Sequence, residues 1–92
     1  MNPSLSFSEA LDLIKSGKLL QREGWNGKGM FVFLVQGSRF QVNRAPLNAI
    51  FPEGTTIDYN AHIDMRTAQG RIVPWLASQD DLLSDDWQVA DA

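Results

Sequence analysis

The chain has 92 residues and a formal net charge of −3, because 8 lysine and arginine residues face 11 aspartate and glutamate residues. This length predicts one domain spanning residues 1–92, with a core so small that self-association is a common source of added stability. The acidic balance argues against binding long nucleic acid through its phosphates. The chain has no cysteine, which excludes disulfides and thiolate metal sites. It has one histidine, His62, which excludes a metal site built from several imidazoles of one chain.

No targeting or membrane segment is expected. The first residues lack the basic region and apolar core of a secretory signal peptide. No apolar run approaches the roughly 18 residues that a membrane helix needs. The default expectation is a protein of the cytoplasm that binds no membrane.

Residues 6–17 are expected to form the first helix. Ser6 and Glu9 have the spacing of a capping box. Apolar side chains recur at helical spacing, at Phe7, Ala10, Leu11 and Ile14. Gly17 is a typical C-terminal stop.

The next segment predicts strands around a glycine-rich stretch. Residues 18–22 favour a short strand, and REGWNGKGM at 22–30 follows it. Residues 30–36 are continuously apolar, which is typical of a strand covered on both faces. The glycine and serine at 37–38 indicate a turn, and residues 39–43 alternate like a half-exposed strand, so these two runs are expected to form a hairpin.

Residues 44–60 carry two prolines and a glycine without clear periodicity. They are expected to form a long loop, and long loops in compact domains tend to be functional or mobile. Leu47, Ile50 and Phe51 make the segment partly apolar, which suggests that it packs on another surface.

A second hairpin is expected from residues 62–67, which alternate in polarity, and residues 71–75. Pro74 should end its second strand, because proline donates no hydrogen bond to a ladder.

A short helix should follow at residues 78–83, capped by Ser78, with Asp80 and Asp81 in its first turn. Residues 86–90 favour a final strand. These elements predict an α+β fold: a small antiparallel sheet with one N-terminal helix and a short second helix.

No catalytic residue is predicted. The aspartate pairs at 80–81 and 85–86 lie at the ends of the second helix, where capping and turn formation explain them better than acid–base chemistry. His62 has no serine or cysteine partner at a recognisable spacing. Zinc-protease, hydrolase-elbow and Walker A patterns are absent, and the glycines of residues 24–29 do not match a dinucleotide fingerprint.

The tryptophans divide into two kinds. Trp87 lies in an alternating strand and is expected in the core. Trp25 and Trp75 lie at breaks, where their rings could stack on a planar ligand while the helix N-terminus after Ala77 offers donors to anionic oxygens. The alternative is that both indoles plug the ends of a small core.

Two motifs resemble the Thoeris anti-defence 2 family, small phage-encoded proteins also found in prophages. The first is REGWNGKGMFVFLV at residues 22–35, and the second is TAQGRIVPWLASQDDLLSDDWQV at residues 67–89. The matching positions are Phe7, Glu9, Ala10, Leu11, Ile14, Lys15, Gly17, Arg22, 24–30, 72–75, Ser78, Asp81, Leu82, Asp86 and Trp87. The resemblance covers nearly the full length, although residues 37–60 match no firm family pattern.

The resemblance implies a sponge that is not an enzyme and needs no cofactor. Such a protein would bind a cyclic ADP-ribose isomer, glycocyclic ADP-ribose, made by bacterial TIR-domain immune enzymes. Holding the signal uncleaved in the cytoplasm of the infected host would keep the Thoeris effector inactive. The family also implies binding of cyclic dinucleotides of the related CBASS pathway, and a homotetramer with pockets between protomers.

Two other classes remain open. One is a phage structural or protein-interaction module with a tryptophan-rich binding face. The other is a hydrolase acting on the same kind of nucleotide.

Motif position and chemistry then assign the ligand-binding residues. Phe7, Trp25 and Trp75 are expected to form stacking or apolar walls, and Met30 to line the pocket.

The expected polar ligand contacts come from the same motifs. Asn26 and Ser78 would hydrogen-bond ribose or base edges, and Asp81 would accept from a ribose hydroxyl. Arg22 and Lys28 are candidates for phosphate, although Lys28 also suits a solvated surface position.

Overall fold

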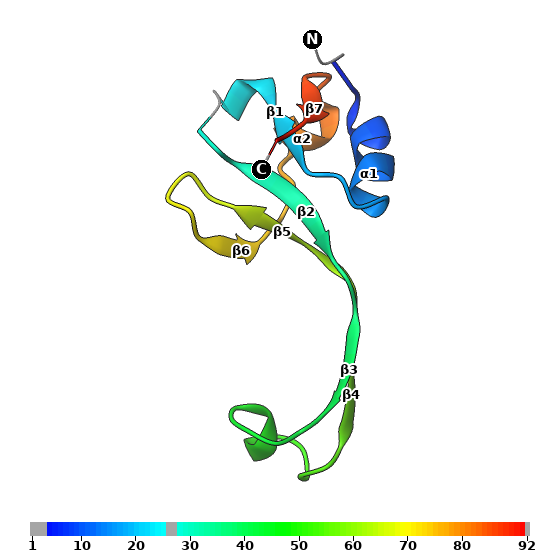
Figure 1. Ribbon diagram of the computed structural model, residues 1–92, viewed down its shortest axis with the longest axis vertical. Coiled ribbons are helices and arrows are strands. Elements are labelled where there is room, and N and C mark those ends of the chain that lie inside the picture. Colours follow the sequence, from blue (N-terminus) through cyan, green and yellow to red (C-terminus); the bar gives the residue numbers. More distant parts are fainter. Residues whose placement is uncertain (1–3, 26–27, 92) are drawn as a thin grey trace.

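The computed structural model describes residues 4–25 and 28–91 and has an α+β fold (Figure 1). The main sheet has five antiparallel strands in the order β6-β5-β2-β1-β7, and β3 and β4 form a separate two-stranded sheet. The strands are β1 (Leu20–Arg22), β2 (Phe31–Val35), β3 (Ser38–Gln41), β4 (Thr56–Tyr59), β5 (His62–Arg66), β6 (Ile72–Pro74) and β7 (Trp87–Val89). The helical segments are α1 (Phe7–Lys15), α2 (Gln79–Leu83) and the 3-10 helices η1 (Glu23–Trp25) and η2 (Leu47–Ala49). The predicted fold class is confirmed.

Helix α1 begins and ends close to where the sequence predicts. Ser6 and Glu9 form the capping box: the Ser6 hydroxyl accepts from the Glu9 backbone N–H, and the Glu9 carboxylate accepts from the Ser6 backbone N–H at 3.1 Å. Gly17, just past the helix, has a φ of +102°, a left-handed conformation that glycine tolerates well. Between these ends, Ala10 and Ile14 are fully buried.

The core lies where α1 packs on β1, β2 and β7. Five side chains there have no exposed surface: Ala10, Ile14, Leu20, Val32 and Trp87. Trp87 is the largest of them, which confirms the prediction that it is a core residue.

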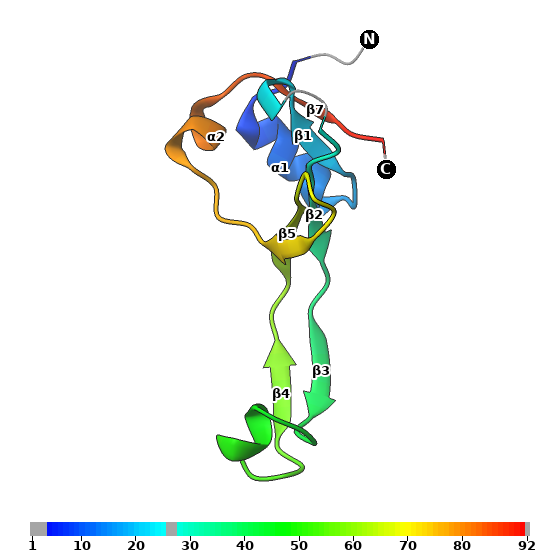
Figure 2. The ribbon, with the colours of Figure 1, turned by 90° about the vertical axis from the view of Figure 1, so that its left-hand side faces the viewer.

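The predicted hairpin of residues 30–36 with residues 39–43 is wrong. Strand β2 pairs with β1 and β5, whereas β3 pairs with β4. The chain continues from β2 into β3 away from the main sheet and returns through β4 into β5 (Figures 1 and 2). Gly37 makes no reversal there. A Cβ at Gly37 would lie 2.8 Å from the Tyr59 carbonyl oxygen, so glycine allows the two legs to approach closely.

The predicted burial of residues 30–36 on both faces is also wrong. Of the strand β2, Val32 is buried and the other residues are partly exposed. The reason is the small amount of chain left to cover the sheet, since α1 has 9 residues and the segment between β2 and β5 lies outside the main body.

Residues 36–61, which we call the arm, project from the main sheet as a two-stranded ribbon (Figure 2). The molecule measures 51 × 26 × 24 Å, and its radius of gyration is 16.2 Å. A compact chain of this length would have a radius of gyration of about 12 Å. The arm therefore accounts for an unusually elongated protomer.

The long loop predicted at residues 44–60 is instead the tip and the returning leg of the arm. It contains η2 and β4, and Val42 is buried beneath the tip. In the described part of the chain, the expected packing does not cover Ile50 and Phe51, which are 66% and 40% exposed, whereas Leu47 is partly buried.

The second half follows the prediction. Strands β5 and β6 form the expected hairpin, with Pro74 as the last residue of β6, opposite Asp64. Ser78 caps α2, and β7 closes the sheet beside β1.

The close approach at Gly37 generates a prediction. In Gly37→Ala the new methyl group would push β4 away from β3, so amide hydrogen exchange in the arm should become faster while the main sheet keeps its protection. Gln36→Ala, at an exposed neighbouring position, is the control and should exchange like the original chain. Equal exchange in the two variants would contradict this role of Gly37.

Candidate functional site

Three aromatic side chains predicted to bind ligand surround the buried indole of Trp87. The ring centroids of Trp25, Phe7 and Trp75 lie 5.4, 5.5 and 5.9 Å from that of Trp87. The two tryptophan pairs are nearly perpendicular, at 78° and 80°, which is a favourable edge-to-face geometry. The fold thus gathers residues from α1, η1 and the β6–α2 connection around one core residue. We call these four residues the aromatic cluster.

Trp25 and Trp75 are each partly buried. Each ring packs against Trp87 and keeps part of its surface open to solvent. The two interpretations of these indoles, as ligand walls and as plugs of the core, are therefore compatible.

An ion-pair cluster lies beside the aromatic cluster. The Arg22 guanidinium donates through Nη1 to Asp81 Oδ1 at 2.9 Å and through Nε to Asp86 Oδ1 at 2.9 Å. The second Asp86 oxygen accepts from the Gly24 backbone N–H at 3.0 Å. Because Gly24 precedes Trp25, this bond holds η1 against β7. We call Arg22, Asp81 and Asp86 the arginine clamp.

Asp81 connects the clamp to helix α2 and to the core. Its Oδ2 accepts from the Ser78 backbone N–H at 3.0 Å, and its own N–H donates to the Ser78 hydroxyl, which completes a capping box. Its carbonyl oxygen accepts from Trp87 Nε1 at 2.9 Å. Asp81 is 8% exposed, so these partners satisfy a carboxylate that is almost removed from water.

The clamp shifts the pKa of each member toward its charged form. The hydrogen bond from Arg22 is the largest influence on Asp86 and lowers its pKa. Burial would raise the pKa of Asp81, but the Ser78 backbone N–H and Arg22 together lower it below its ordinary value. The hydrogen bond to Asp86 is likewise the main cause of the raised pKa of Arg22.

The remaining predicted site residues are placed as follows. Met30 is partly buried just before β2, and Lys28 is exposed. Asn26 lies outside the described residues. Gly29 has a φ of +75° and its carbonyl oxygen accepts from Arg66 Nη1 at 2.9 Å, which anchors this end of the glycine-rich segment to β5.

One cavity opens beside the aromatic cluster. It has a volume of about 480 Å³ and is lined by residues 58–63, Pro74 and Trp75. Trp75 is the one predicted site residue on its wall. The cavity therefore lies where the base of the arm meets the end of β6.

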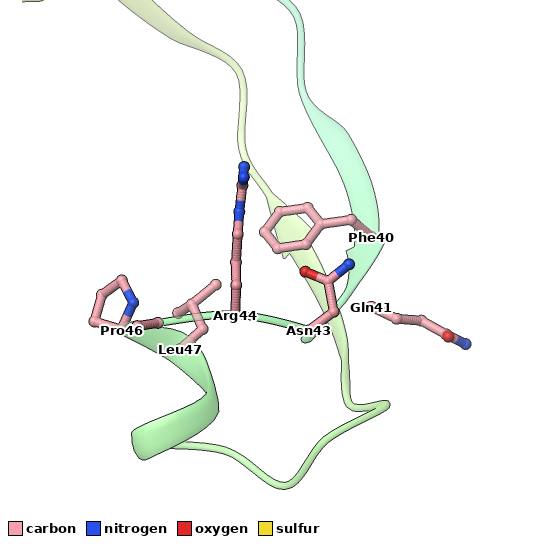
Figure 3. A pocket seen from close by; sticks show the side chains of 7 residues that line it. Phe40, Gln41, Asn43, Arg44, Pro46 and Leu47 are labelled. Carbon is pink, nitrogen blue, oxygen red and sulfur yellow. The ribbon is translucent and has the colours of Figure 1, made fainter.

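A second cavity, of about 770 Å³, lies at the tip of the arm (Figure 3). Its lining residues are Phe40, Gln41, Asn43, Arg44, Ala45, Pro46 and Leu47. It is remote from the aromatic cluster and contains none of the predicted site residues.

The imidazole of His62 already has partners. Its Nδ1 lies 3.1 Å from the Asn60 carbonyl oxygen, and its Nε2 lies 3.6 Å from Asp64 Oδ1. Among residues 4–25 and 28–91, no group of three or more histidine, cysteine or acidic side chains could hold a metal ion. In the same part of the chain, no helix has the length and apolarity to cross a membrane.

Comparison with known proteins gives the family. Residues 5–90 match the profile of the Thoeris anti-defense 2-like domain. The chain belongs to this family. It is also 35% identical to the protein named Thoeris anti-defense 2 of Bacillus phage SP01, over 92 residues that cover 97% of this chain and 98% of that relative. The resemblance drawn from the two motifs is thereby confirmed: this is a phage Thoeris anti-defence protein, and such a protein acts in the infected host cell.

Several residues of this region escaped the sequence-based selection. Asp86 completes the clamp and accepts from the Gly24 backbone N–H, and Tyr59 and Asn60 line the cavity beside Trp75. Arg22 and Asp86 are 64 positions apart, so no local spacing indicates their contact. The tyrosine and asparagine belong to the segment without periodicity, whose path depends on the arm.

The clamp predicts how stability depends on pH. The pKa values of Asp81 and Asp86 lie below their ordinary 3.8 in the folded protein, so both carboxylates stabilise the fold above about pH 4 and lose this effect as the pH falls through their lowered values. Asp86→Asn should reduce the free energy of unfolding at pH 7 by about 1–3 kcal/mol and flatten its decrease in acid. Urea unfolding between pH 2 and pH 7 measures both effects.

Asp85→Asn is the matched control, because Asp85 is exposed and adjacent in sequence. It should change stability by less than about 0.5 kcal/mol. If the two variants are equally stable and equally sensitive to acid, the clamp does not have this energetic role.

Proposed function

We propose that this protein is a sponge for a cyclic ADP-ribose isomer, glycocyclic ADP-ribose, made by bacterial TIR-domain immune enzymes. It binds the signal without cleaving it and so keeps the Thoeris effector inactive. The observation that carries this proposal is the gathering of Phe7, Trp25 and Trp75 around Trp87 beside an open cavity, in a chain of the Thoeris anti-defence family. Tight binding without turnover needs walls and hydrogen bonds, and no nucleophile or acid–base pair.

The cavity beside Trp75 suits a nucleotide of this kind. Its volume of about 480 Å³ lies in the ordinary range for small-molecule sites, roughly 300–1,000 Å³. Trp75 and Tyr59 offer flat surfaces for a purine, and Asn60 offers an amide for ribose hydroxyls.

The polar members of the predicted site divide into two roles in this proposal. Arg22 and Asp81 bind each other, so we propose that they hold the walls of the site in place. The remaining N–H donors of Arg22 and the remaining lone pairs of the Asp81 carboxylate would contact the ligand. Ser78 accepts from the Asp81 N–H, which leaves its own hydroxyl proton for a ligand oxygen. Asn26, Met30 and the exposed Lys28 retain their proposed contacts from the glycine-rich segment.

The negative charge of the ligand requires cationic groups that the lining of this cavity does not contain, and this favours a pocket shared between protomers. The residues that line the cavity beside Trp75 include no lysine or arginine, and the lining residue Asp58 is paired with Arg39 at 2.6 Å. A pyrophosphate carries about two negative charges that charge-assisted donors must meet. We propose that a second protomer supplies part of this cationic wall within a homotetramer, and that the assembly also binds cyclic dinucleotides of the CBASS pathway.

An interaction module of a phage structure is the second candidate function. The observation in its favour is the exposure of aliphatic side chains in β6, in α2 and in the connection between them, with Ile72 54%, Leu76 92% and Leu83 77% exposed. The tryptophan-rich face expected for such a module is less available to a partner, because Trp25 and Trp75 each pack part of their surface against the buried Trp87.

Sequestration is tested by incubating the protein with glycocyclic ADP-ribose and assaying the filtrate before and after heat denaturation. We expect the signal to be absent before heating and to be recovered intact afterwards. Free signal before heating would contradict binding, and a cleavage product would identify a hydrolase. Heat-denatured protein added at the start is the control.

The wall role of Trp75 predicts a loss of affinity. Trp75→Ala removes one stacking surface, so affinity for glycocyclic ADP-ribose should fall about 10- to 100-fold in calorimetry. Ile72→Ala, on the exposed part of β6, is the control and should bind normally. A Trp75→Ala variant that is folded and keeps full affinity would place the ligand elsewhere.

A further inference from the structure

Arg66, the last residue of β5, differs from the other basic side chains of the molecule. The partly buried Arg22 is bound by two carboxylates, and the exposed Arg39 pairs with Asp58. Five further basic side chains are exposed: Lys15, Lys18, Lys28, Arg44 and Arg71. Arg66 is partly buried, and within residues 4–25 and 28–91 it forms no ion pair. A charge that is partly removed from water is normally paired with an opposite charge.

Backbone carbonyl groups hold the Arg66 guanidinium in place. Its Nη1 donates to the Gly29 carbonyl oxygen at 2.9 Å and lies 3.5 Å from the Thr67 carbonyl oxygen. Gly29 and Gly70 have left-handed φ values of +75° and +83°. A Cβ would lie 2.9 Å from Nη1 at Gly29 and 3.4 Å from Nη2 at Gly70. The guanidinium therefore lies between the glycine-rich segment and the β5–β6 turn, where the two glycines allow a close approach.

One edge of this guanidinium has no acceptor. In the described part of the chain, Nε and Nη2 of Arg66 make no hydrogen bond. Both atoms are accessible to solvent, because the described residues include no buried side-chain nitrogen or oxygen without a partner. In Arg22 the same two atoms bind the two oxygens of Asp86, at 2.9 and 3.5 Å. This edge fits a carboxylate or a phosphate with two parallel hydrogen bonds.

The acidic residue on the same face of β5 does not occupy this edge. Asp64 is two positions before Arg66, so the two side chains lie on one face of the strand. The Asp64 carboxylate lies 3.6 Å from His62 Nε2 and forms no ion pair with Arg66. The free edge of Arg66 therefore remains available to an anion from outside the chain.

An aromatic side chain stands beside Arg66. Phe31 of β2 lies directly opposite Arg66 in the ladder, and opposite residues share a face of the sheet. The Phe31 ring is partly exposed, and its centroid lies 5.8 Å from that of Phe33. A nucleotide presents both a phosphate and a flat base. A guanidinium edge beside an aromatic ring therefore suits a nucleotide better than a small inorganic anion.

We propose that Arg66 binds the phosphate oxygens of the sequestered nucleotide through Nε and Nη2. Its Nη1 holds the Gly29 carbonyl oxygen, so the same side chain also positions the glycine-rich segment that carries Lys28 and Met30. The proposal rests on the proposed function and adds a cation, which the lining of the cavity beside Trp75 does not contain. Arg66 and the lining residue His62 are at opposite ends of β5, so this contact lies on the side of the site formed by the glycine-rich segment.

The first test measures affinity for glycocyclic ADP-ribose by calorimetry. Arg66→Gln removes the charge and the paired donors, so affinity should fall about 10- to 100-fold. Arg66→Lys keeps the charge but cannot make two parallel hydrogen bonds, so its affinity should lie between those of the original chain and Arg66→Gln. Arg71→Gln is the control, because it removes the same charge from an exposed side chain just before β6, and it should bind normally.

A second measurement separates phosphate binding from the anchoring of Gly29. The nitrogen-15 Nε–H resonance of Arg66, assigned by its loss in Arg66→Gln, should shift on saturation with ligand, while that of Arg71 stays unchanged. A loss of affinity in Arg66→Gln with an unshifted Arg66 resonance would assign the effect to the anchor and overturn the proposal. Equal affinities of Arg66→Gln and Arg71→Gln would overturn it as well. The heat-release assay on the original chain tests sequestration separately, so a failure of the Arg66 contact is distinguishable from a failure of the proposed function.

Discussion

The site depends on one guanidinium that binds two carboxylates. Arg22 in β1 holds Asp81 at the start of α2 and Asp86 just before β7. Each carboxylate also accepts a backbone hydrogen bond near a tryptophan. Asp86 accepts from the N–H of Gly24, which precedes Trp25, and Asp81 accepts from the N–H of Ser78, which lies in the segment after Trp75. Removing any member would leave charges without partners in a half-buried place, which is far less favourable than the intact cluster.

The clamp and the aromatic cluster constrain each other through Trp87. Its indole N–H donates to the Asp81 carbonyl oxygen, and its ring is the surface on which Phe7, Trp25 and Trp75 pack. These hydrogen bonds and ring contacts hold Trp25 and Trp75 against Trp87 within one protomer. Preorganised walls favour tight binding, because little conformational entropy is lost on association. This is the property that a sequestering protein needs.

Sequence reasoning succeeded where the signal was local. The capping boxes at Ser6 and Ser78 and the proline at the end of β6 depend on spacings of a few residues, and each was located correctly. The prediction of a turn at Gly37 was wrong. A glycine between two apolar runs gives the same sequence pattern whether the chain reverses there or a neighbouring strand passes close to its backbone. The motifs also led to the right family and to three aromatic residues that the fold brings together. The clamp could not be predicted, since the partners of Arg22 are 59 and 64 positions away.

In the proposed homotetramer, a protomer with so small a core would gain packing from its neighbours. The central claim, that ligand lies against the outer indoles while Trp87 stays in the core, is tested most directly by indole N–H resonances during titration with glycocyclic ADP-ribose. We expect the signals of Trp25 and Trp75 to shift while the Trp87 N–H keeps its protection from solvent exchange. Unchanged Trp25 and Trp75 signals at saturating ligand would contradict the account.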